Sequence, residues 1–454
     1  MTLKIVLLAI AVALLGALLR PVSLLKEATG AAAQTVCSKG FVSGLSPDAV
    51  LRDHLLPEPG VRLIAWAMQV DVDHKRRDVR ARVFGSFESH AVFRAGRGCT
   101  LVYAGGPAPS DLPPPQPLRT PSDVLEAGHV GGNTDPRLTA AVDKAFAEPA
   151  SGAPRNTLAV VVVHKGRVIA ERYAAGIGPD TPLLTHSVAK SIVNALVGIL
   201  VRQGKLRIDD RVAIPAWRDD ARGAITIDDL LRMQAGFGFD EGAGASQSTS
   251  IWFTEPDMAQ AASSAALVMR PGESWGYCSR CYILLSRIIG QAIGGGVQGL
   301  RDFAERELFA PLGMSSVVAE FDEVGTLMGA NAMFATPRDL ARFGMLYLHD
   351  GVVGGRRILP EGWVKYSTRP TLDSGYGAGF WLNTTQASIS EWRMNWGIPG
   401  APTDAFMARG YMGQYIVVVP SAALVVVRMG QSHARAMEMT SVAALVTDLV
   451  SLLR

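Results

Sequence analysis

The feature that most constrains the fold is the uncharged stretch 191–201, which begins directly after Lys190. Its apolar residues occupy most faces of a helix rather than one stripe, so the helix must be buried on most sides. The chain has 454 residues and 48% hydrophobic content, enough for a large core and for more than one domain. The stretch therefore predicts a central helix over residues 187–204.

Ser187 and Lys190 stand at the start of this helix. Residues three apart on a helix share a face, so the lysine can reach the serine hydroxyl. A lysine can act as the base for a serine nucleophile when desolvation lowers its pKa, and the apolar helix would supply that desolvation. The alternative interpretation is a helix cap followed by a solvated lysine, because Ser23 and Lys26 have the same spacing in the N-terminal segment.

The N-terminal segment has the layout of an export signal. Residues 5–19 are uncharged and follow Lys4, and Ala31–Ala33 offers a small-residue cleavage site. We expect an exported protein, periplasmic or secreted, in which residues 1–35 are a signal peptide or residues 5–25 a membrane anchor. The formal net charge of +3 is spread along the chain without a basic block, so a nucleic-acid partner is not expected.

Four cysteines fall in two pairs. Export permits disulfides, and Cys37 and Cys99 are predicted to pair across a small β-rich unit at 36–105; two isolated buried thiols are the alternative. Strands are expected in this unit at residues 63–67, 79–84 and 91–93. Cys278 and Cys281 have the spacing of a zinc half-site, but the chain lacks a second paired motif, so we expect a local disulfide or two thiols and no metal.

Seven prolines between Gly105 and Pro121 predict an extended linker, assigned to 106–129. After it, hairpins are predicted at 158–173 and 415–429, with helices between them and a last helix near 434–453. The expected fold of 130–454 is therefore α/β (α+β), an antiparallel sheet flanked by helices plus an all-helical subdomain.

Several motifs in residues 130–454 resemble one family, the class C β-lactamase and penicillin-binding-protein-like serine hydrolases, and within it the 6-aminohexanoate-dimer hydrolases and family VIII-type esterases. The resemblance is carried by Ser187-x-x-Lys190 and by the segments 225–236, 271–277, 309–314 and 335–344. It implies a β-lactamase/transpeptidase-like fold.

The resemblance also implies roles for further residues. Tyr277 matches the tyrosine of a Tyr-x-Asn motif that works with the lysine as general base and acid, while Ser279 replaces the asparagine as a substrate-binding residue. The third family motif matches residues 408–411, so that the backbone N–H of Tyr411 would complete an oxyanion hole with that of Ser187. A register at 411–414 is nearly as good, and the two place substrate contacts at Gly410, Gly413 and Gln414. Neither register supplies the cation that would hold a β-lactam carboxylate.

These residues predict a serine hydrolase that cleaves a small ester or amide through an acyl-enzyme on Ser187, with Lys190 and Tyr277 as general base and acid. No cofactor is required. Asp240 or Glu241 is a candidate for binding a substrate amine, with solvated loop carboxylates as the alternative. The sequence indicates neither the substrate nor an oligomeric state.

Two other functions are compatible with the sequence. A penicillin-binding or cell-wall-peptide-binding module would acylate but turn over slowly. An α/β-hydrolase would instead use Ser274 in Gly-Glu-Ser-Trp-Gly, followed in the chain by Asp404 and His433. That motif needs a strand before it and a helix directly after it, and the surrounding pattern indicates neither.

Overall fold

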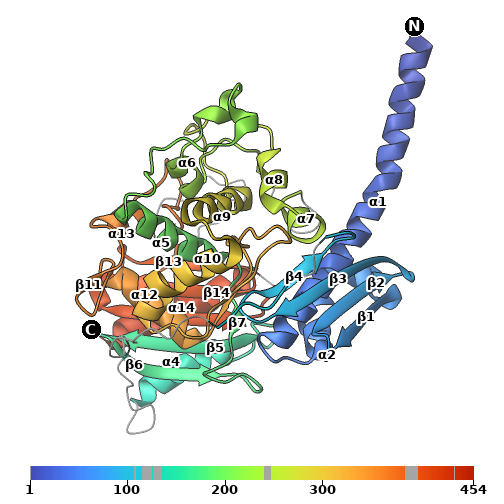
Figure 1. Ribbon diagram of the computed structural model, residues 1–454. Helices are drawn as coiled ribbons and strands as arrows, with labels where there is room; N and C mark the ends of the chain where they lie inside the picture. The colour runs from blue at the N-terminus through green and yellow to red at the C-terminus, as the bar shows by residue number, and fades with distance from the viewer. Residues whose placement is uncertain are drawn as a thin grey trace.

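The computed structural model describes residues 2–106, 109–114, 125, 135–152, 154–239, 247–383, 397–433 and 435–453. Its larger part is built on an antiparallel sheet with the strand order β12-β13-β14-β15-β5-β6 (Figure 1). The strands are β5 (Thr157–His164), β6 (Arg167–Tyr173), β12 (Trp381–Leu382), β13 (Phe406–Gly410), β14 (Gln414–Val419) and β15 (Leu424–Gly430). Both predicted hairpins are present, and the pairing of β15 with β5 joins the two ends of the domain in one sheet.

Helices cover both faces of this sheet. The helices α4 (Pro136–Phe146) and α14 (Arg435–Leu452) pack together against β5, β6 and β15, and α12 (Pro337–Leu348) packs against β14, β15 and β5. Gly344 of α12 permits a close approach, because a Cβ there would lie 2.6 Å from Val425 Cγ1. The mixed fold with an antiparallel sheet and flanking helices is therefore confirmed.

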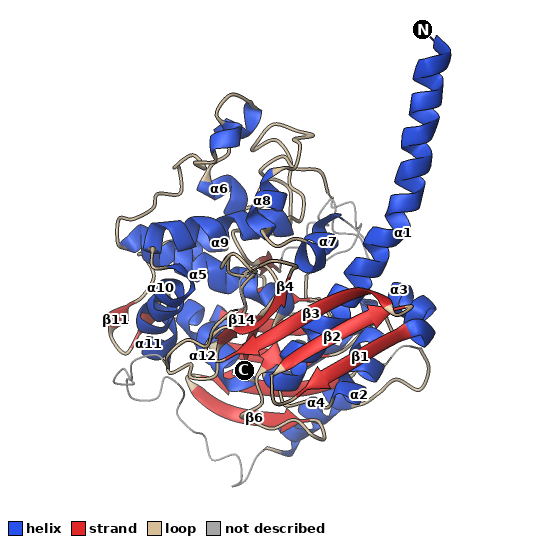
Figure 2. Cartoon of the chain, turned by 45° about the vertical axis from the view of Figure 1, so that its right-hand side comes forward, coloured by secondary structure: helices blue, strands red, loops and turns tan. Residues whose placement is uncertain are grey.

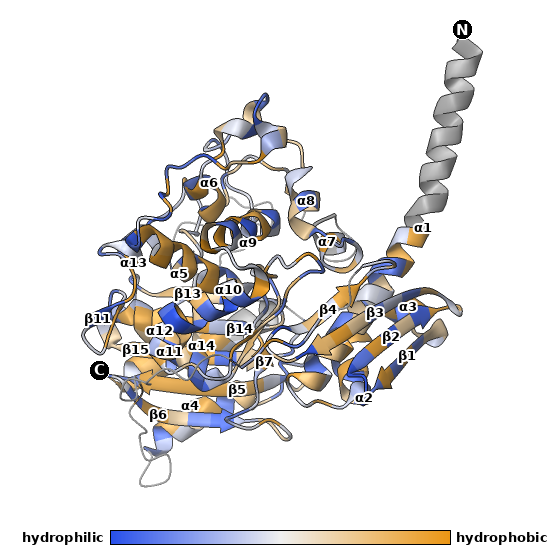
Figure 3. Ribbon diagram, in the orientation of Figure 1, coloured by the Kyte–Doolittle hydropathy of each residue, from blue (hydrophilic) through white to orange (hydrophobic). Residues whose placement is uncertain are grey.

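The helical part stands above the sheet and contains α5 (Ala189–Arg202), α6 (Ile227–Leu231), α8 (Met258–Ser263), α9 (Ser279–Ile293) and α10 (Gly296–Ala304). Residues 189–200 of α5 are all buried, as its uncharged sequence predicts. Figure 3 shows the hydrophobic residues concentrated on α5 and the central strands.

The N-terminal unit, residues 22–105, is a four-stranded antiparallel meander crossed by a helix (Figure 2). Its elements are α1 (Thr2–Phe41), α2 (Pro47–Val50), α3 (Pro59–Ile64), β1 (Met68–Asp73), β2 (Asp78–Val83), β3 (Ser86–Arg94) and β4 (Gly98–Val102). The predicted disulfide between Cys37 and Cys99 ties α1 to β4.

One predicted strand in this unit is wrong, and the structure adds detail at two predicted segment boundaries. Residues 63–67, expected as a strand, form the end of α3 and a 3-10 turn, because a short apolar cluster does not by itself distinguish a strand from a helix. The boundary at residue 35 falls inside α1, whose residues Ala32, Ala33 and Val36 are buried in the core of the unit. Residues 109–114 of the linker are held against the unit, where Asp111 accepts a hydrogen bond from the backbone of Ala95.

A buried carboxyl group joins the two parts of the molecule. Glu320, which precedes α12, accepts hydrogen bonds from Ser38 Oγ (2.7 Å), Gln34 Nε2 (2.8 Å) and the backbone N–H of Cys99 (2.9 Å). Burial raises the pKa of Glu320 to about 7. Among the residues from 22 onward whose side chains are described, no helix combines the length and apolar character needed to cross a membrane; the side chains of residues 2–21 lie outside the described part.

Candidate active site

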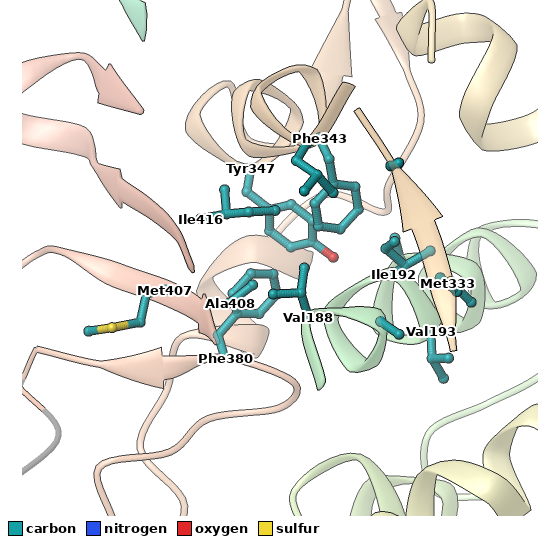
Figure 4. Close-up of a cluster of buried hydrophobic side chains, with 14 of the residues drawn as sticks. Val188, Ile192, Val193, Met333, Phe343, Tyr347, Phe380, Met407, Ala408 and Ile416 are labelled. Carbon is teal, nitrogen blue, oxygen red and sulfur yellow. The ribbon is translucent and has the colours of Figure 1, made fainter. Parts of the chain in front are cut away.

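Ser187 lies in the 3-10 turn η3 (His186–Val188), which leads directly into α5. Val188 and Ile192 are fully buried, and Figure 4 shows them packed near Phe380 and Ala408. Ser187 itself is only partly buried. The apolar cluster therefore packs against the turn, while Ser187 remains partly exposed.

Lys190 is brought to the serine by the helical spacing. Its Nζ donates hydrogen bonds to Ser187 Oγ and to the carbonyl of Ala330, each at 2.8 Å, and the residue is only 1% exposed. The same Nζ lies 5.0 Å from the centre of the Tyr277 ring. The structure thus places the predicted nucleophile, lysine and tyrosine at one site.

Tyr277 is held by aromatic neighbours that the sequence analysis did not identify. Its ring stacks on Trp381, with centroids 5.6 Å apart and planes 17° apart, and meets the edge of Tyr376 at 6.3 Å. The aromatic residues between 376 and 381 are visible in the sequence, but they lie about a hundred positions from Tyr277, so the sequence did not link them to it. Only the fold brings them together.

The residue after Tyr277 begins a second disulfide, Cys278 to Cys281. Cys278 is the N-cap of α9, and its sulfur accepts a hydrogen bond from the backbone N–H of Cys281. Of the two predictions for this pair, the local disulfide is therefore present. This disulfide closes a short loop of backbone directly after Tyr277.

Gly410 brings the third motif close to the turn that carries Ser187. It ends β13, and a Cβ at this position would lie 2.4 Å from the carbonyl oxygen of Thr185, so only glycine allows this approach. Tyr411 follows, and its ring meets that of His186 in a T-shaped contact with the ring centroids 5.7 Å apart. The short strand β12 pairs only with Phe406 and Met407 of β13, so the end of β13 faces the η3 turn. This arrangement favours the register 408–411 for the third motif over the register 411–414.

The other residues predicted to contact substrate lie in different surroundings. Gln414 is buried, and its amide is occupied by the carbonyls of Tyr411 and Gly430 and the N–H of Gly430, so the structure does not support a substrate contact for it. Gly413 has a φ of +88° in the same turn. Ser279 is buried in the first turn of α9. Asp240 and Glu241 lie outside the described residues.

The rival nucleophile Ser274 lacks the required surroundings. It lies in a loop, with neither a strand directly before it nor a helix directly after it in the described stretch 265–280. Asp404 accepts hydrogen bonds from Ser421, while His433 contacts Glu58 and the carbonyl of Asp53. The α/β-hydrolase interpretation is therefore wrong, because its three residues are engaged in separate structures.

Comparison with known proteins agrees with this geometry. A model of the beta-lactamase family matches residues 142–450. The chain belongs to the beta-lactamase family.

Its relatives in this family include hydrolases and penicillin-binding proteins. The chain is 28% identical over 245 residues to a 6-aminohexanoate-dimer hydrolase of Paenarthrobacter ureafaciens, a match over 49% of this chain and 61% of the relative. It is 27% identical over 311 residues to penicillin-binding protein 4 of Amycolatopsis lactamdurans, covering 59% and 75%. Among solved structures, a penicillin-binding protein homologue from Caulobacter crescentus shares the fold with a TM-score of 0.53, 18% identity and coverage of 70% and 98%.

Proposed function

We propose that this member of the beta-lactamase family is a serine hydrolase that cleaves a small ester or amide through an acyl-enzyme on Ser187. The observation that carries the proposal is the 2.8 Å contact between Lys190 Nζ and Ser187 Oγ, beside the ring of Tyr277. A hydroxyl, a buried amine and a phenol at one point form the set of groups needed for acyl transfer without a cofactor.

In the proposed reaction, the amine form of Lys190 takes the proton of Ser187 as its oxygen attacks the substrate carbonyl. The backbone N–H groups of Ser187 and Tyr411 stabilise the oxyanion. Tyr277 then protonates the leaving alcohol or amine, and the acyl-enzyme forms. Water then attacks the acyl carbon and gives a proton to the Tyr277 phenolate, while the protonated Lys190 returns its proton to the Ser187 oxygen as the acid leaves, which regenerates Ser187, Lys190 and Tyr277.

The substrate class follows from the third motif. Ala408 stands where the resemblance implies a cation for a β-lactam carboxylate, and it is buried in the apolar cluster. We therefore propose linear esters or amides without that carboxylate as substrates. The name of the Paenarthrobacter ureafaciens relative, 6-aminohexanoate-dimer hydrolase, is compatible with this class.

The test is intact mass after treatment with a fluorophosphonate, together with turnover of a p-nitrophenyl ester. Ser187→Ala should abolish labelling and turnover, and the matched control Ser274→Ala should retain both. Retained turnover in Ser187→Ala would refute the proposal. A penicillin-binding module would show a stable acyl-enzyme mass with no sustained turnover.

We also propose that the protein is exported and remains attached to the membrane by the segment 5–25. Cleavage at Ala31–Ala33 would cut α1 where Ala32, Ala33 and Cys37 are buried against the sheet of the N-terminal unit. Leu63, Trp66 and Phe84 are 76%, 80% and 54% exposed. Leu63 lies in α3, Trp66 in the 3-10 turn after it and Phe84 between β2 and β3. The start of β3 lies where α1 leaves the sheet, because Lys26 of α1 donates a hydrogen bond to the carbonyl of Glu88 there. Recovery of the mature chain in the soluble periplasmic fraction, with a new N-terminus, would refute attachment.

A further inference from the structure

Side chains of the N-terminal unit contact side chains in both segments whose backbone N–H groups form the proposed oxyanion hole. One segment is His186–Ser187 and the other is Gly410–Tyr411. The side chains that reach them are His54, which follows α2, and Glu58, which precedes α3. Neither belongs to the domain that carries the nucleophile, so their contacts join the two parts of the molecule at the active site.

The first contact supports the residue before the nucleophile. His186 has a φ of +47°, a conformation that a side-chain-bearing residue keeps only when its surroundings hold it. The ring of His54 lies parallel to that of His186, with centroids 5.9 Å apart, and both residues are buried. Asn331 Oδ1 also contacts this ring, at 3.1 Å from Nδ1 of His186.

His54 is itself held in place. Its Nδ1 lies 2.6 Å from Lys39 Nζ of α1 and 3.2 Å from Nε2 of Gln431, which follows β15. Burial lowers the pKa of His186 to about 3 and lowers that of His54 well below its usual value, so both rings are neutral when they stack. Two neutral rings face each other without charge repulsion.

The second contact supports the other half of the oxyanion hole. Tyr411 Oη donates a hydrogen bond of 2.7 Å to Glu58 Oε1, and His433 Nδ1 lies 3.5 Å from the same oxygen. His433 Nε2 is 3.1 Å from the carbonyl of Asp53, so His433 contacts the N-terminal unit at two residues, Glu58 and Asp53. Although burial opposes it, hydrogen bonds from His433 and Tyr411 lower the pKa of Glu58.

We infer that His54 and Glu58 are positioning residues for the hydrolase proposed above. His54 holds the turn that presents the Ser187 N–H, and Glu58 holds the strand end that presents the Tyr411 N–H. The N-terminal unit is thus part of the active site rather than an appendage. This inference rests on the proposed function, since it concerns the backbone N–H groups of Ser187 and Tyr411 that form the proposed oxyanion hole.

The test compares Glu58→Leu and Glu58→Gln in the full chain with a p-nitrophenyl ester. Glu58→Leu removes the acceptor for Tyr411, so kcat should fall about 10- to 100-fold with little change in KM, because misplacing one oxyanion donor weakens transition-state binding. Glu58→Gln keeps an acceptor oxygen and should restore most of kcat. Glu88→Leu is the matched control, since Glu88 lies on β3 and pairs with Arg80 away from these segments.

A wild-type kcat in folded Glu58→Leu would overturn the role of Glu58, as would an equal loss in Glu88→Leu. If Glu58→Leu does not fold, Tyr411→Phe removes the same hydrogen bond from the other side, and a wild-type kcat in that variant overturns it. His54→Phe, which keeps a stacked ring, should retain more kcat than His54→Leu; equal activities would overturn the role of His54. Retained activity in Ser187→Ala would instead refute the proposed function, so the two failures are distinct.

Discussion

Replacing Glu320 by glutamine should remove a specific pH dependence from the stability of the protein. Its carboxyl group is fully buried between α1, β4 and the larger domain, and burial raises its pKa from 4.5 to about 7. Because one pH unit corresponds to about 1.4 kcal/mol, ionising Glu320 in the folded protein costs about 3 kcal/mol more than in the unfolded chain.

The sign follows from the direction of the change. The pKa of Glu320 is higher in the folded protein than in the unfolded chain. Its stabilising contribution to the free energy of unfolding is therefore fully present below pH 4.5 and is lost as the pH rises through 7. The free energy of unfolding of the wild type, relative to Glu320→Gln, should therefore fall by about 3 kcal/mol between pH 4 and pH 8. Glu27 and Asp322, whose pKa values burial also raises, are common to both proteins and cancel in the difference.

The assay is urea unfolding of both proteins at several pH values, followed by fluorescence and far-UV circular dichroism. Glu323→Gln is the matched control, because Glu323 accepts a hydrogen bond from the backbone of Tyr103 in the same contact but is only partly buried. A difference between wild type and Glu320→Gln that does not change with pH would refute the reasoning.

Three further predictions concern the site and the disulfides. Lys190→Gln should lower kcat about 10²- to 10⁴-fold, the usual contribution of a general base, as measured by ester turnover; unchanged kcat would remove the lysine from the mechanism. Replacing Cys37 and Cys99 by serine should lower the free energy of unfolding by about 4 kcal/mol, because their sequence separation of 62 closes a long loop. The same change at Cys278 and Cys281, three residues apart, should cost about 2 kcal/mol in denaturant titration, and a larger cost than at the long loop would contradict the loop-entropy argument.

Most of the correct sequence predictions came from patterns within short stretches of the chain. The hairpins 158–173 and 415–429 follow from short, largely continuous apolar runs joined by turns a few residues long. The contact between Ser187 and Lys190 follows from one turn of helix. The family motifs added Tyr277 and the strand end at Gly410, whose closeness to Thr185 accounts for the glycine. Predictions failed where a short apolar run, as at 63–67, fits two kinds of element.

The sequence by itself determined that Ser187, the proposed nucleophile, lies one turn from Lys190 at the start of a buried apolar helix, because this depends on spacings within a single element. The tertiary structure alone decided that Trp381 stacks on Tyr277 and that Gln414 is occupied by the backbone. It alone decided that Glu58 reaches Tyr411, 353 residues along the chain. Contacts of this kind arise when separately formed surfaces pack together, and no periodicity along the chain records which side chains will meet.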